Sequence, residues 1–404
     1  MKKIAIIGGG ASGLIAAFFA SRPDHQVTLF EKQGKLGRKI ATTGNGRCNI
    51  TNQNLNPDKY YSKDPNFIKK VLAEFGLDKT KKFFQKIGLP FLEGEQGKLY
   101  PASWQAITVV NLLSYQLKKK GVEVKLNRQI EKIDLDKKRF KLTTTGKETY
   151  FFDKVILATG SQAHPPIGGS KKGYELSSSL GHKINPPFPA ILPLNIPLKI
   201  LHRLQGIKWN CLLTVKNKNE IITSFKGELL FTGYGLSGPA ALSISRSVNE
   251  LILKNQVPEI IVDFFPKVSE VDLLKKFNLL WHDKEKKVSF SLLGIINDKI
   301  AEILLSIAGF ESNLRVKNLT EVEKNRIIKI FKGLSLSPGK PRSFNEAVVA
   351  AGGVETSEVN PTNMESKIVK NLYLTGELLD VDGQSGGYNL QFAWSSGALA
   401  GLAQ

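Results

Sequence analysis

Apolar and polar residues follow one another at the start of the chain in an order that predicts a strand, a helix and a second strand. Residues 3–7 (KIAII) form a short β-branched apolar run, typical of a strand buried in a parallel sheet. Residues 14–20 are apolar and rich in alanine, as in a buried helix. A second apolar run at 27–30 (VTLF) ends in Glu31. We therefore expect a strand, turn, helix and strand that end at this acid.

Further along the chain the pattern changes. Residues 206–224 alternate and are rich in β-branched residues, which predicts antiparallel strands, and residues 270–332 have the spacing of amphipathic helices. Residues 153–161 (DKVILATGS) and 372–380 (LYLTGELLD) return to buried strands that open into glycine-containing turns. The predicted fold class is α/β, with an antiparallel and a helical segment inserted between its parts.

The turn after the first strand has the glycine spacing Gly8-x-Gly10-x-x-Gly13. Gly8 permits a tight turn, Gly10 lets the backbone approach a pyrophosphate, and Gly13 lets the helix pack closely on the strand. The helix N-terminus offers free N–H groups and the positive end of its dipole to phosphates. Glu31 ends the second strand, where a carboxylate accepts hydrogen bonds from ribose hydroxyls and disfavours a 2′-phosphate. These features predict a Rossmann-type dinucleotide site that does not take NADP.

The glycine spacing alone does not separate FAD from NAD, and two later segments favour FAD. One is the turn 158–160, which is similar to the second dinucleotide contact of flavoproteins with two dinucleotide-binding domains. The other is the strand that leads to Gly376, followed by Gly386 and Gly387 before an apolar helical pattern. A helix that begins there would direct its N-terminus at the pyrimidine edge of a flavin, where negative charge accumulates on reduction. The alternative for these late glycines is an ordinary turn between a helix and a strand.

With these residues in hand, the chain resembles a bacterial family of NAD(P)/FAD-dependent oxidoreductases, the aminoacetone-oxidase-like or BaiN-type flavoproteins. The resemblance covers nearly the whole chain and rests on the segments GRKIATTGNGRCNITN (37–52), KLYPASWQA (98–106), GELLFTGYGLSGPAAL (227–242), AAGGV (350–354), MESK (364–367) and GELLDVDGQSGGYNLQ (376–391). The family usually has His at Gly233 and Thr at Ala350 and Asn363. The missing histidine leaves open whether proton transfer or substrate binding differs in this chain.

The resemblance implies a flavin site built from several of these segments. Arg38 and Lys39 would neutralise the pyrophosphate, and the turn 43–46 would approach the isoalloxazine with backbone N–H groups. Arg47 and Asn49 would hydrogen-bond carbonyl groups of the flavin or the substrate. The predicted catalytic residues are Arg47, Asn49, Tyr234 and Tyr388. The predicted cofactor-binding residues are Gly8, Gly10, Ala11, Ser12, Gly13, Glu31, Lys32, Arg38, Lys39, Thr43, Gly44, Asn45, Gly46, Ile130, Ala158, Thr159, Gly160, Gly376, Glu377, Asp380, Gly387, Tyr388, Asn389 and Leu390.

The resemblance also implies a discontinuous domain organisation. A Rossmann-like FAD-binding domain of the two-dinucleotide-binding type would comprise residues 1–192 and 342–404. The insert, 193–341, would be a substrate or cap domain with a β-barrel-like part at about 193–265 and a helical part at about 266–335. Proline-rich segments at 185–197 and 337–344 fit two stiff crossings between these domains.

The composition of the chain limits the classes of partner and cofactor that we expect. The 57 basic and 36 acidic residues give a net charge of +21, but the lysines are spread along the chain without a basic arm, so we do not expect a nucleic-acid partner. No apolar run approaches the roughly 18 residues of a membrane-spanning helix, and no metal-ligand spacing is present. Cys48 and Cys211 form no CxxC, which fits a reducing cytoplasm and excludes a redox-active dithiol. We expect Cys48 to be a small buried hydrophobe.

Two functions from different classes remain. The first is a flavin-dependent oxidoreductase that acts on a small molecule by hydride transfer through flavin N5, with dioxygen or a transient NAD(P)H co-substrate as redox partner. NAD(P)H would visit the flavin directly, because GGSKKG at 168–173 lacks the strand and helix of a second nucleotide site. The second is an FAD-containing protein that binds or modifies RNA, which depends on the +21 charge. The substrate and the oligomeric state are not fixed by the sequence.

Overall fold

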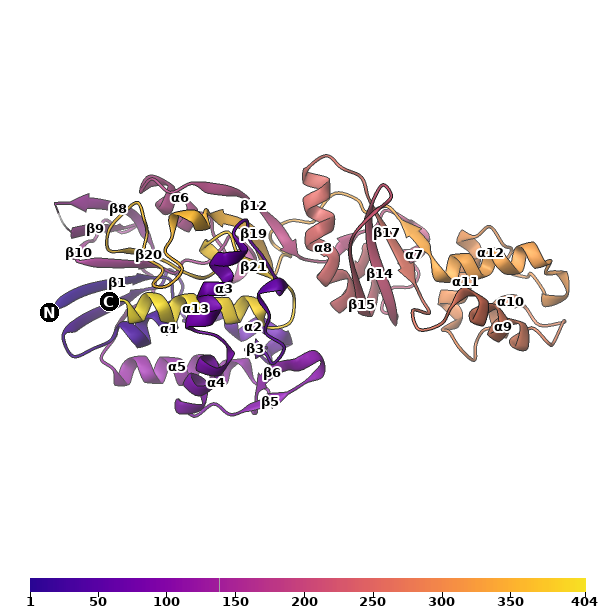
Figure 1. Cartoon of the computed structure of the whole chain (residues 1–404), viewed down its shortest axis with the longest axis horizontal. Coiled ribbons are helices and arrows are strands. Elements are labelled where there is room, and N and C mark those ends of the chain that lie inside the picture. The colour runs from indigo at the N-terminus through magenta and orange to yellow at the C-terminus, as the bar shows by residue number, and fades with distance from the viewer. Residues whose placement is uncertain (138) are drawn as a thin grey trace. The chain divides into compact units, whose positions relative to one another are not determined.

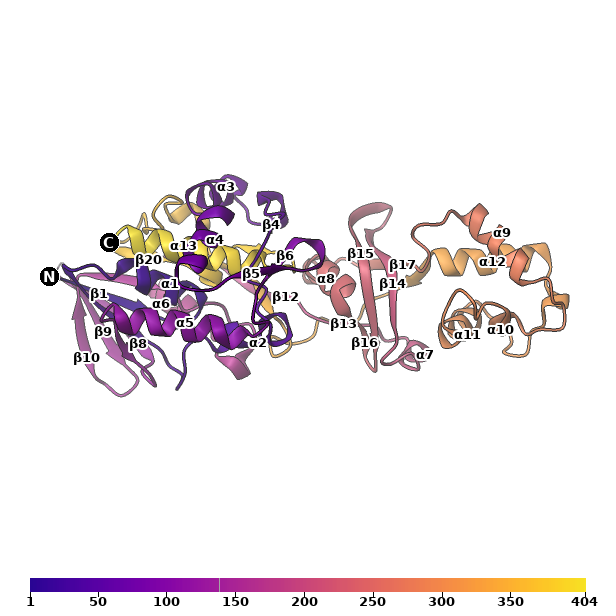
Figure 2. The ribbon, with the colours of Figure 1, turned by 90° about the horizontal axis from the view of Figure 1, so that it is seen from below.

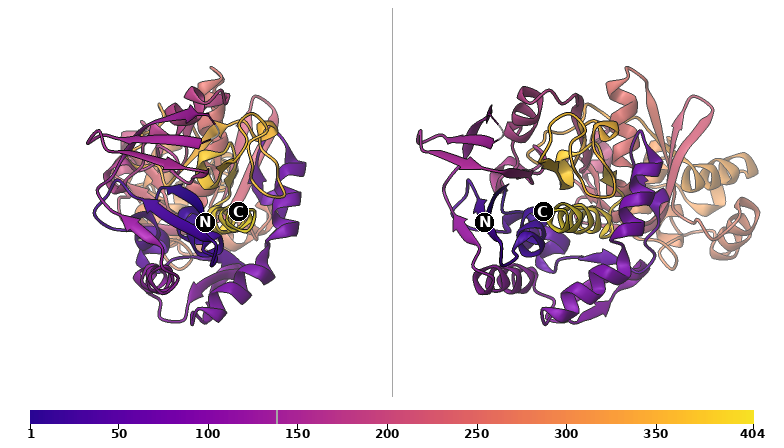
Figure 3. Two further views of the ribbon diagram at one scale, coloured as in Figure 1. Left: turned by 90° about the vertical axis from the view of Figure 1, so that its left-hand side faces the viewer. Right: turned by 60° about the vertical axis from the view of Figure 1, so that its left-hand side comes forward.

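The computed structural model describes residues 1–137 and 139–404. Within them the chain divides into two compact units: unit 1, residues 1–189 with 344–404, and unit 2, residues 190–343. The limits expected from the sequence, after 192 and before 342, lie close to these. Both ends of the chain lie side by side on unit 1 in every view (Figure 1 and Figure 3). That unit 1 binds FAD and that unit 2 serves the substrate stay predictions.

Unit 1 is built on a five-stranded parallel sheet with the order β20–β11–β1–β2–β7. Its strands are β1 (Lys2–Ile7), β2 (His25–Phe30), β7 (Glu123–Lys125), β11 (Lys154–Leu157) and β20 (Leu372–Leu374). β1 takes the centre because residues 4–7 are apolar and buried, and a central parallel strand is covered on both faces. Ile6 lies opposite Ile156 on one side and Leu29 on the other. All four strands predicted from apolar runs therefore belong to one sheet.

Two helices of unit 1 pack side by side along their length: α1 (Ala11–Ala20) and α13 (Tyr388–Leu402) (Figure 1 and Figure 2). Glycines on α13 permit this approach. A Cβ on Gly397 would lie 2.3 Å from the Ser12 carbonyl oxygen, and one on Gly401 would lie 2.6 Å from that of Ala16. Only glycine leaves room for such contact between backbones.

The remaining elements of unit 1 surround this core. The other helices are α2 (Arg38–Gly46), α3 (Pro65–Glu74), α4 (Leu77–Lys86), α5 (Ala106–Lys119) and α6 (Lys172–Ser179). Smaller sheets are formed by β8 (Ile130–Asp136) with β9 (Arg139–Thr144) and β10 (Thr149–Phe152), by β3 (Thr51–Asn52) with β6 (Lys98–Pro101) and β5 (Phe91–Glu93), and by β4 (Tyr60–Tyr61) with β21 (Asp382–Gly383).

The first proline-rich segment has regular structure where the chain leaves unit 1. Residues 184–191 form β12 (Ile184–Ile191), which pairs with β19 (Val349–Val354) and reaches residue 190, where unit 2 begins. A two-stranded sheet leaves one edge of each strand free, so prolines that lack an N–H are tolerated there. The prolines therefore shape an edge strand.

Unit 2 has its own hydrophobic core, beneath a six-stranded sheet whose paired strands are antiparallel. The strand order is β13–β16–β15–β14–β17–β18. The strands are β13 (Leu194–Asn195), β14 (Lys208–Asn217), β15 (Glu220–Thr232), β16 (Gly235–Ser237), β17 (Pro258–Asp263) and β18 (Leu334–Leu336). The helices are α7 (Lys199–His202), α8 (Gly238–Leu253), α9 (Glu270–Leu280), α10 (Val288–Ser291), α11 (Asp298–Ile307) and α12 (Glu321–Lys332). An antiparallel part thus precedes a helical part.

Candidate flavin site

Of the three glycines of the motif at the start of α1, Gly8 in the turn and Gly13 in the helix have no room for a side chain, whereas Gly10 faces open space. Gly8 has φ +111°, and a Cβ there would lie 2.3 Å from the Ala158 carbonyl oxygen. A Cβ on Gly13 would lie 1.9 Å from the Gly8 carbonyl oxygen, whereas one on Gly10 would meet nothing within 4 Å. α1 begins after Gly10 without a side-chain cap or an acidic residue in its first turn. Its N–H groups therefore remain available to an anion.

Glu31 binds this turn from the end of β2. One carboxylate oxygen, Oε2, accepts a hydrogen bond from Gly9 N at 2.7 Å, and Oε1 accepts one from Gln33 N at 2.8 Å. The next residue, Lys32, is half-buried; burial lowers the pKa of its ammonium group, against the smaller opposing effect of Glu31. The carboxylate is thus fixed at the edge of the glycine turn, where a ribose is expected.

The second predicted contact, residues 158–160, lies against the first. Ala158 contacts Gly8 and Gly13, as the positions of added Cβ atoms show. Thr159 Oγ1 is buried and has no hydrogen-bond partner among the described residues, and Gly160 has φ +69° with open space before it. Ile130, at the start of β8, lies buried in the core of unit 1.

Residues 38–49 form an interrupted helix followed by an exposed turn. α2 leaves helical geometry at Thr43, Gly44 and Asn45, and Cys48 N closes the turn with a hydrogen bond to the Thr43 carbonyl oxygen at 2.9 Å. Residues 44–47 are exposed, so the turn presents its backbone outward. Asn49 Oδ1 is buried without a hydrogen-bond partner among the described residues. Such an atom is costly unless a ligand or water satisfies it.

Three predicted segments meet at Glu377. Lys39 Nζ donates to Glu377 Oε2 at 2.6 Å, and Ser161 Oγ donates to the same oxygen at 3.3 Å. Arg38 instead donates to Gln33 Oε1 at 2.5 Å. Ser161 was not among the predicted site residues; its place directly after the Ala-Thr-Gly turn is the signal that could have found it.

Asp380 is held by a residue that sequence reasoning missed. Asn185 Nδ2 donates to Asp380 Oδ2 at 2.7 Å and to Glu355 Oε2 at 3.0 Å. Lys63 Nζ donates to Asn185 Oδ1 at 2.8 Å. Asn185 lies in the proline-rich segment, whose sequence gave no reason to connect it with an acid near residue 380.

The N-terminus of α13 faces the Asn49 turn. Gly387 has φ +101°, and a Cβ there would lie 3.0 Å from Asn49 Oδ1. Like α1, α13 has no side-chain cap and no acid in its first turn. Leu390 is partly buried in the first turn and packs against the hydrophobic core of unit 1. The helix therefore brings a second set of free N–H groups to the 43–49 turn.

Two predicted side chains in this helix are already engaged with the protein. Tyr388 Oη donates to the Asn54 carbonyl oxygen at 3.4 Å. The Asn389 amide bonds Gly383 twice: Oδ1 accepts from its N–H at 2.8 Å, and Nδ2 donates to its carbonyl oxygen at 2.7 Å. Asn389 thus holds β21 to the start of α13.

In unit 2, Tyr234 follows β15. The Arg342 guanidinium carbon lies 3.9 Å from its ring centroid, a close cation–π contact. Ser237 precedes α8, and its hydroxyl oxygen accepts no capping hydrogen bond from the first turn of the helix. A Cβ on Gly233 would approach Gln205 Oε1 at 2.8 Å, so the Gln205 side chain lies where a larger residue would extend. The substrate role of Tyr234 stays a prediction.

These observations fit FAD. Two uncapped helix N-termini suit a pyrophosphate and an electron-rich ring edge, and Gly10 leaves the first of them accessible. Two buried polar atoms, Asn49 Oδ1 and Thr159 Oγ1, lack partners among the described residues and belong to predicted cofactor-binding segments. The roles of the individual residues stay predictions.

The cysteines are poor nucleophiles. Burial raises the pKa of the Cys48 thiol to about 12, against a smaller lowering by a hydrogen bond with Thr43. Burial likewise raises the pKa of Cys211 to about 12. A thiol is reactive as its thiolate, which is nearly absent at neutral pH for such a pKa.

A buried histidine network went unnoticed in the sequence. His182 Nδ1 lies 2.9 Å from Glu358 Oε2, and its Nε2 lies 2.9 Å from Ser366 Oγ. The serine oxygen also accepts hydrogen bonds from the backbone N–H groups of Ile368 and Val369. The hydroxyl is thus committed to a turn, and the network is structural.

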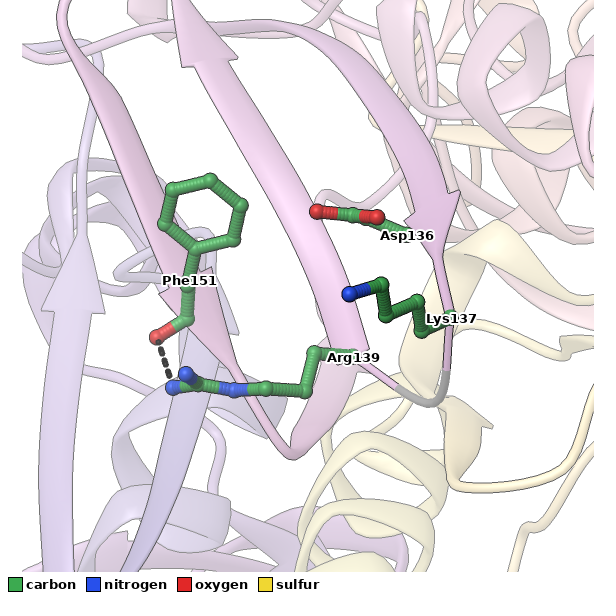
Figure 4. Close-up of a pocket in the computed structure, with 4 residues that line it drawn as sticks. All are labelled: Asp136, Lys137, Arg139 and Phe151. Carbon is green, nitrogen blue, oxygen red and sulfur yellow. Dashed lines mark hydrogen bonds between the residues drawn. The ribbon is translucent and has the colours of Figure 1, made fainter.

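A surface depression of about 600 Å³ lies on the β8–β10 sheet (Figure 4). Asp136, Lys137, Arg139 and Phe151 line it, and Arg139 donates to the Phe151 carbonyl oxygen at 3.1 Å. None of them is a predicted site residue. The depression is a weaker candidate for the flavin site than the turns, because none of its lining residues lies at a helix N-terminus or has a buried polar atom without a partner among the described residues.

Two further properties concern metal binding and membrane insertion. Within residues 1–137 and 139–404, no three His, Cys, Asp or Glu side chains gather as metal ligands. In the same residues no helix has both the length and the apolar character that crossing a bilayer requires. A cytoplasmic location stays a prediction.

Comparison with known proteins extends this picture. Residues 2–403 match the family described as HI0933-like protein Rossmann domain. The chain is 36% identical to the 3-dehydro-bile acid delta(4,6)-reductase of Clostridium scindens, over 100% of this chain and 99% of the relative. It is 30% identical to the ribosomal RNA dihydrouridine synthase of Escherichia coli, over 97% and 95% of the two chains.

A solved structure shares the fold. The 3-ketosteroid delta1-dehydrogenase from Sterolibacterium denitrificans superposes with a TM-score of 0.53 at 10% identity, over 99% of each chain. The full-length family match and the 36% identity then decide the assignment. The chain belongs to the HI0933-like Rossmann family and is a flavin-dependent oxidoreductase.

Proposed function

We propose that the protein is an NAD(P)H-dependent flavoenzyme that reduces a carbon–carbon double bond conjugated with a carbonyl in a small molecule. The names of two relatives support the reaction: one places ring double bonds (delta 4,6) beside a 3-dehydro position, and the other denotes the dihydro form of uridine. A double bond conjugated with a carbonyl is common to both. The reaction would consume one NAD(P)H and one proton for each double bond.

The observation that carries the proposal is the pair of uncapped helix N-termini. The α1 terminus, with Gly10 open and Glu31 beside it, would hold the dinucleotide, and Lys39 would stand by its phosphates. The α13 terminus and Asn49 would meet the flavin ring. FAD, when bound, supplies hydride transfer through N5.

The chain's own residues would orient the substrate. Arg47 is exposed at the end of the turn, and its guanidinium can donate hydrogen bonds to a substrate carbonyl, which polarises the conjugated double bond. Tyr388 Oη bonds the Asn54 carbonyl, so it would first have to leave that partner to donate a proton. No histidine stands at Gly233, and we propose solvent as the proton source.

The test is a visible spectrum of the purified protein with FAD, followed by anaerobic addition of NADH or NADPH. We expect flavin bands, bleaching by one of the two nucleotides, and recovery of colour when a 3-keto-4-ene steroid is added. A yellow protein that neither nucleotide bleaches would instead favour an oxidase with dioxygen as acceptor. Absence of flavin bands after reconstitution would overturn the proposal.

A second candidate is an FAD-dependent enzyme that reduces uridine in RNA. Two relatives named ribosomal RNA dihydrouridine synthase, at 30% and 32% identity, and the +21 charge favour it. The charge is not concentrated, since unit 2 holds 23 of the 57 basic and 14 of the 36 acidic residues and so carries +9 of the total. RNA retention that falls steeply with salt, together with dihydrouridine formed in the retained RNA, would support this candidate.

A further inference from the structure

Arg47, at the end of α2, forms an aromatic and cationic cluster with two side chains from another segment. Tyr100 lies in β6, and Trp104 follows in the turn before α5. Their rings stack with 4.9 Å between centroids and 27° between planes. The Arg47 guanidinium carbon lies 5.5 Å from the Trp104 ring centroid. We call Arg47, Tyr100 and Trp104 the aromatic platform.

The platform is built onto the 43–49 turn. A Cβ on Gly44 would lie 3.4 Å from Tyr100 Cε1, and one on Gly94 would lie 3.0 Å from Tyr100 Cε2, so the ring is held between two glycines. Ile50 N donates to the Leu99 carbonyl oxygen at 2.8 Å and joins the turn to β6. The positions of Tyr100 and Trp104 therefore follow that of the predicted flavin turn.

The backbone is strained where it presents Trp104. Its φ is +54°, in the left-handed region that bulky residues avoid. Asn45, Gln96 and Cys48 in the neighbouring segments share this conformation, with φ of +54°, +59° and +59°. Strained residues gather at binding and catalytic sites, where the surrounding structure enforces them. Trp104 is also 40% exposed, whereas Trp394 is fully buried.

Arg47 is available to a ligand. Its side chain has no ion pair with a carboxylate and no hydrogen bond in the described part of the chain, and it lies over the Trp104 ring, near the Tyr100 hydroxyl. A guanidinium offers five N–H donors in one plane. A partly exposed indole ring beside free donors suits a flat ring that carries an oxygen acceptor at its edge.

We propose that the aromatic platform binds the planar conjugated ring of the substrate, with Trp104 stacked against the ring and Arg47 donating to its carbonyl or carboxylate oxygen. The inference rests on the proposed function, because the ring held here is the one to be reduced beside the 43–49 turn. A free cyclic enone and the uracil base of RNA share this chemistry.

The test measures binding to the oxidised holoenzyme by calorimetry, without NAD(P)H, so that no turnover is needed. The probes are a 3-keto-4-ene steroid carboxylic acid and uridine 5′-monophosphate. The variants are W104N, which removes the ring but keeps a residue that tolerates the left-handed backbone, W104F, which keeps a ring, and R47Q. W209F in unit 2 is the matched control.

We expect one probe to bind, W104N and R47Q each to weaken it about tenfold, and W104F and W209F to change it less than about threefold. The FAD content should be the same in all variants. The probe that binds identifies the source of the ring.

Three results would overturn the proposal: unchanged binding by W104N, loss of FAD in parallel with probe affinity, which would assign the platform to the cofactor, or binding of neither probe by the wild-type holoenzyme. No hydride is transferred in this binding assay. Its result can therefore be interpreted even if the proposed reduction does not occur.

Discussion

Lys39 Nζ lies 2.6 Å from Glu377 Oε2 and so joins the start of α2 to the turn that follows β20. The side chains are 31% and 15% exposed, so the pair is largely buried. If Lys39 also serves the pyrophosphate, the two members of the pair have opposite effects on FAD, since one attracts and the other repels the phosphates.

We predict that K39M raises the dissociation constant of FAD about tenfold, because it removes a charge-assisted partner and leaves the Glu377 carboxylate facing the phosphates. E377Q should keep the affinity of the wild type, as Lys39 is then free for the phosphates. Flavin fluorescence quenching on apoprotein measures both constants. Equal losses in the two variants would contradict this assignment.

Substitutions of two glycines in the same motif should impair different properties of the protein, G13A its stability and G10A its affinity for FAD. G13A places a Cβ 1.9 Å from the Gly8 carbonyl oxygen and should lower the Tm of the apoprotein markedly. G10A meets nothing within 4 Å in the protein, and φ at Gly10 is −84°, so its apoprotein should keep the wild-type Tm. The added methyl group should still lower FAD affinity at least tenfold if a pyrophosphate approaches there. Tight FAD binding by G10A would exclude this approach.

Stability should fall as the pH drops from about 7.5 to about 5.5, in part through His182. Burial lowers the pKa of His182 below its ordinary value, against the opposing effect of Glu358. Below the pKa of an unfolded histidine, the unfolded chain binds a proton at this residue and the folded chain does not, so the free energy of unfolding decreases. Above that pKa both states are neutral at this residue, and its contribution to stability is fully present. The change in Tm over this range should be smaller in H182Q. An identical change would assign the pH dependence to other groups.

The thiols of Cys48 and Cys211 should not react with thiol reagents in the folded protein. With a pKa of about 12, each has roughly one thiolate in ten thousand at pH 8. We expect no reaction with Ellman's reagent under native conditions and two reacting thiols in guanidinium chloride. Rapid labelling of one thiol in the native protein would show that its burial is transient.

The glycine positions were predictable because their requirement is local. A strand followed at once by a turn and a helix forces Gly8 and Gly13 into contact, whatever the rest of the chain does. The start of α13 at Gly387 followed in the same way from glycines before an apolar run. Site residues whose positions depend on contacts between neighbouring elements of the chain can therefore be predicted from the sequence.

Contacts that depend on register between distant strands were not predictable. Arg47 meets Trp104 only because the segment at Ile50 hydrogen-bonds β6 at Leu99, and no pattern in either segment specifies that pairing. Asn185 reaches Asp380 from β12, whose proline-rich sequence does not specify that partner. These positions are set by tertiary pairing, which residue periodicity does not record.

The parallel sheet of unit 1 draws β1, β2 and β11 from the chain before unit 2 and β20 from the chain after it, with α13 packed on α1 last of all. On the ribosome, the uninterrupted residues 190–343 with their own core can fold while the sheet still lacks an edge strand and the predicted cofactor site still lacks a helix. If α13 belongs to the FAD site as predicted, FAD binds only after synthesis passes α13, and nascent chains arrested before residue 372 should emerge with a folded insert and no flavin.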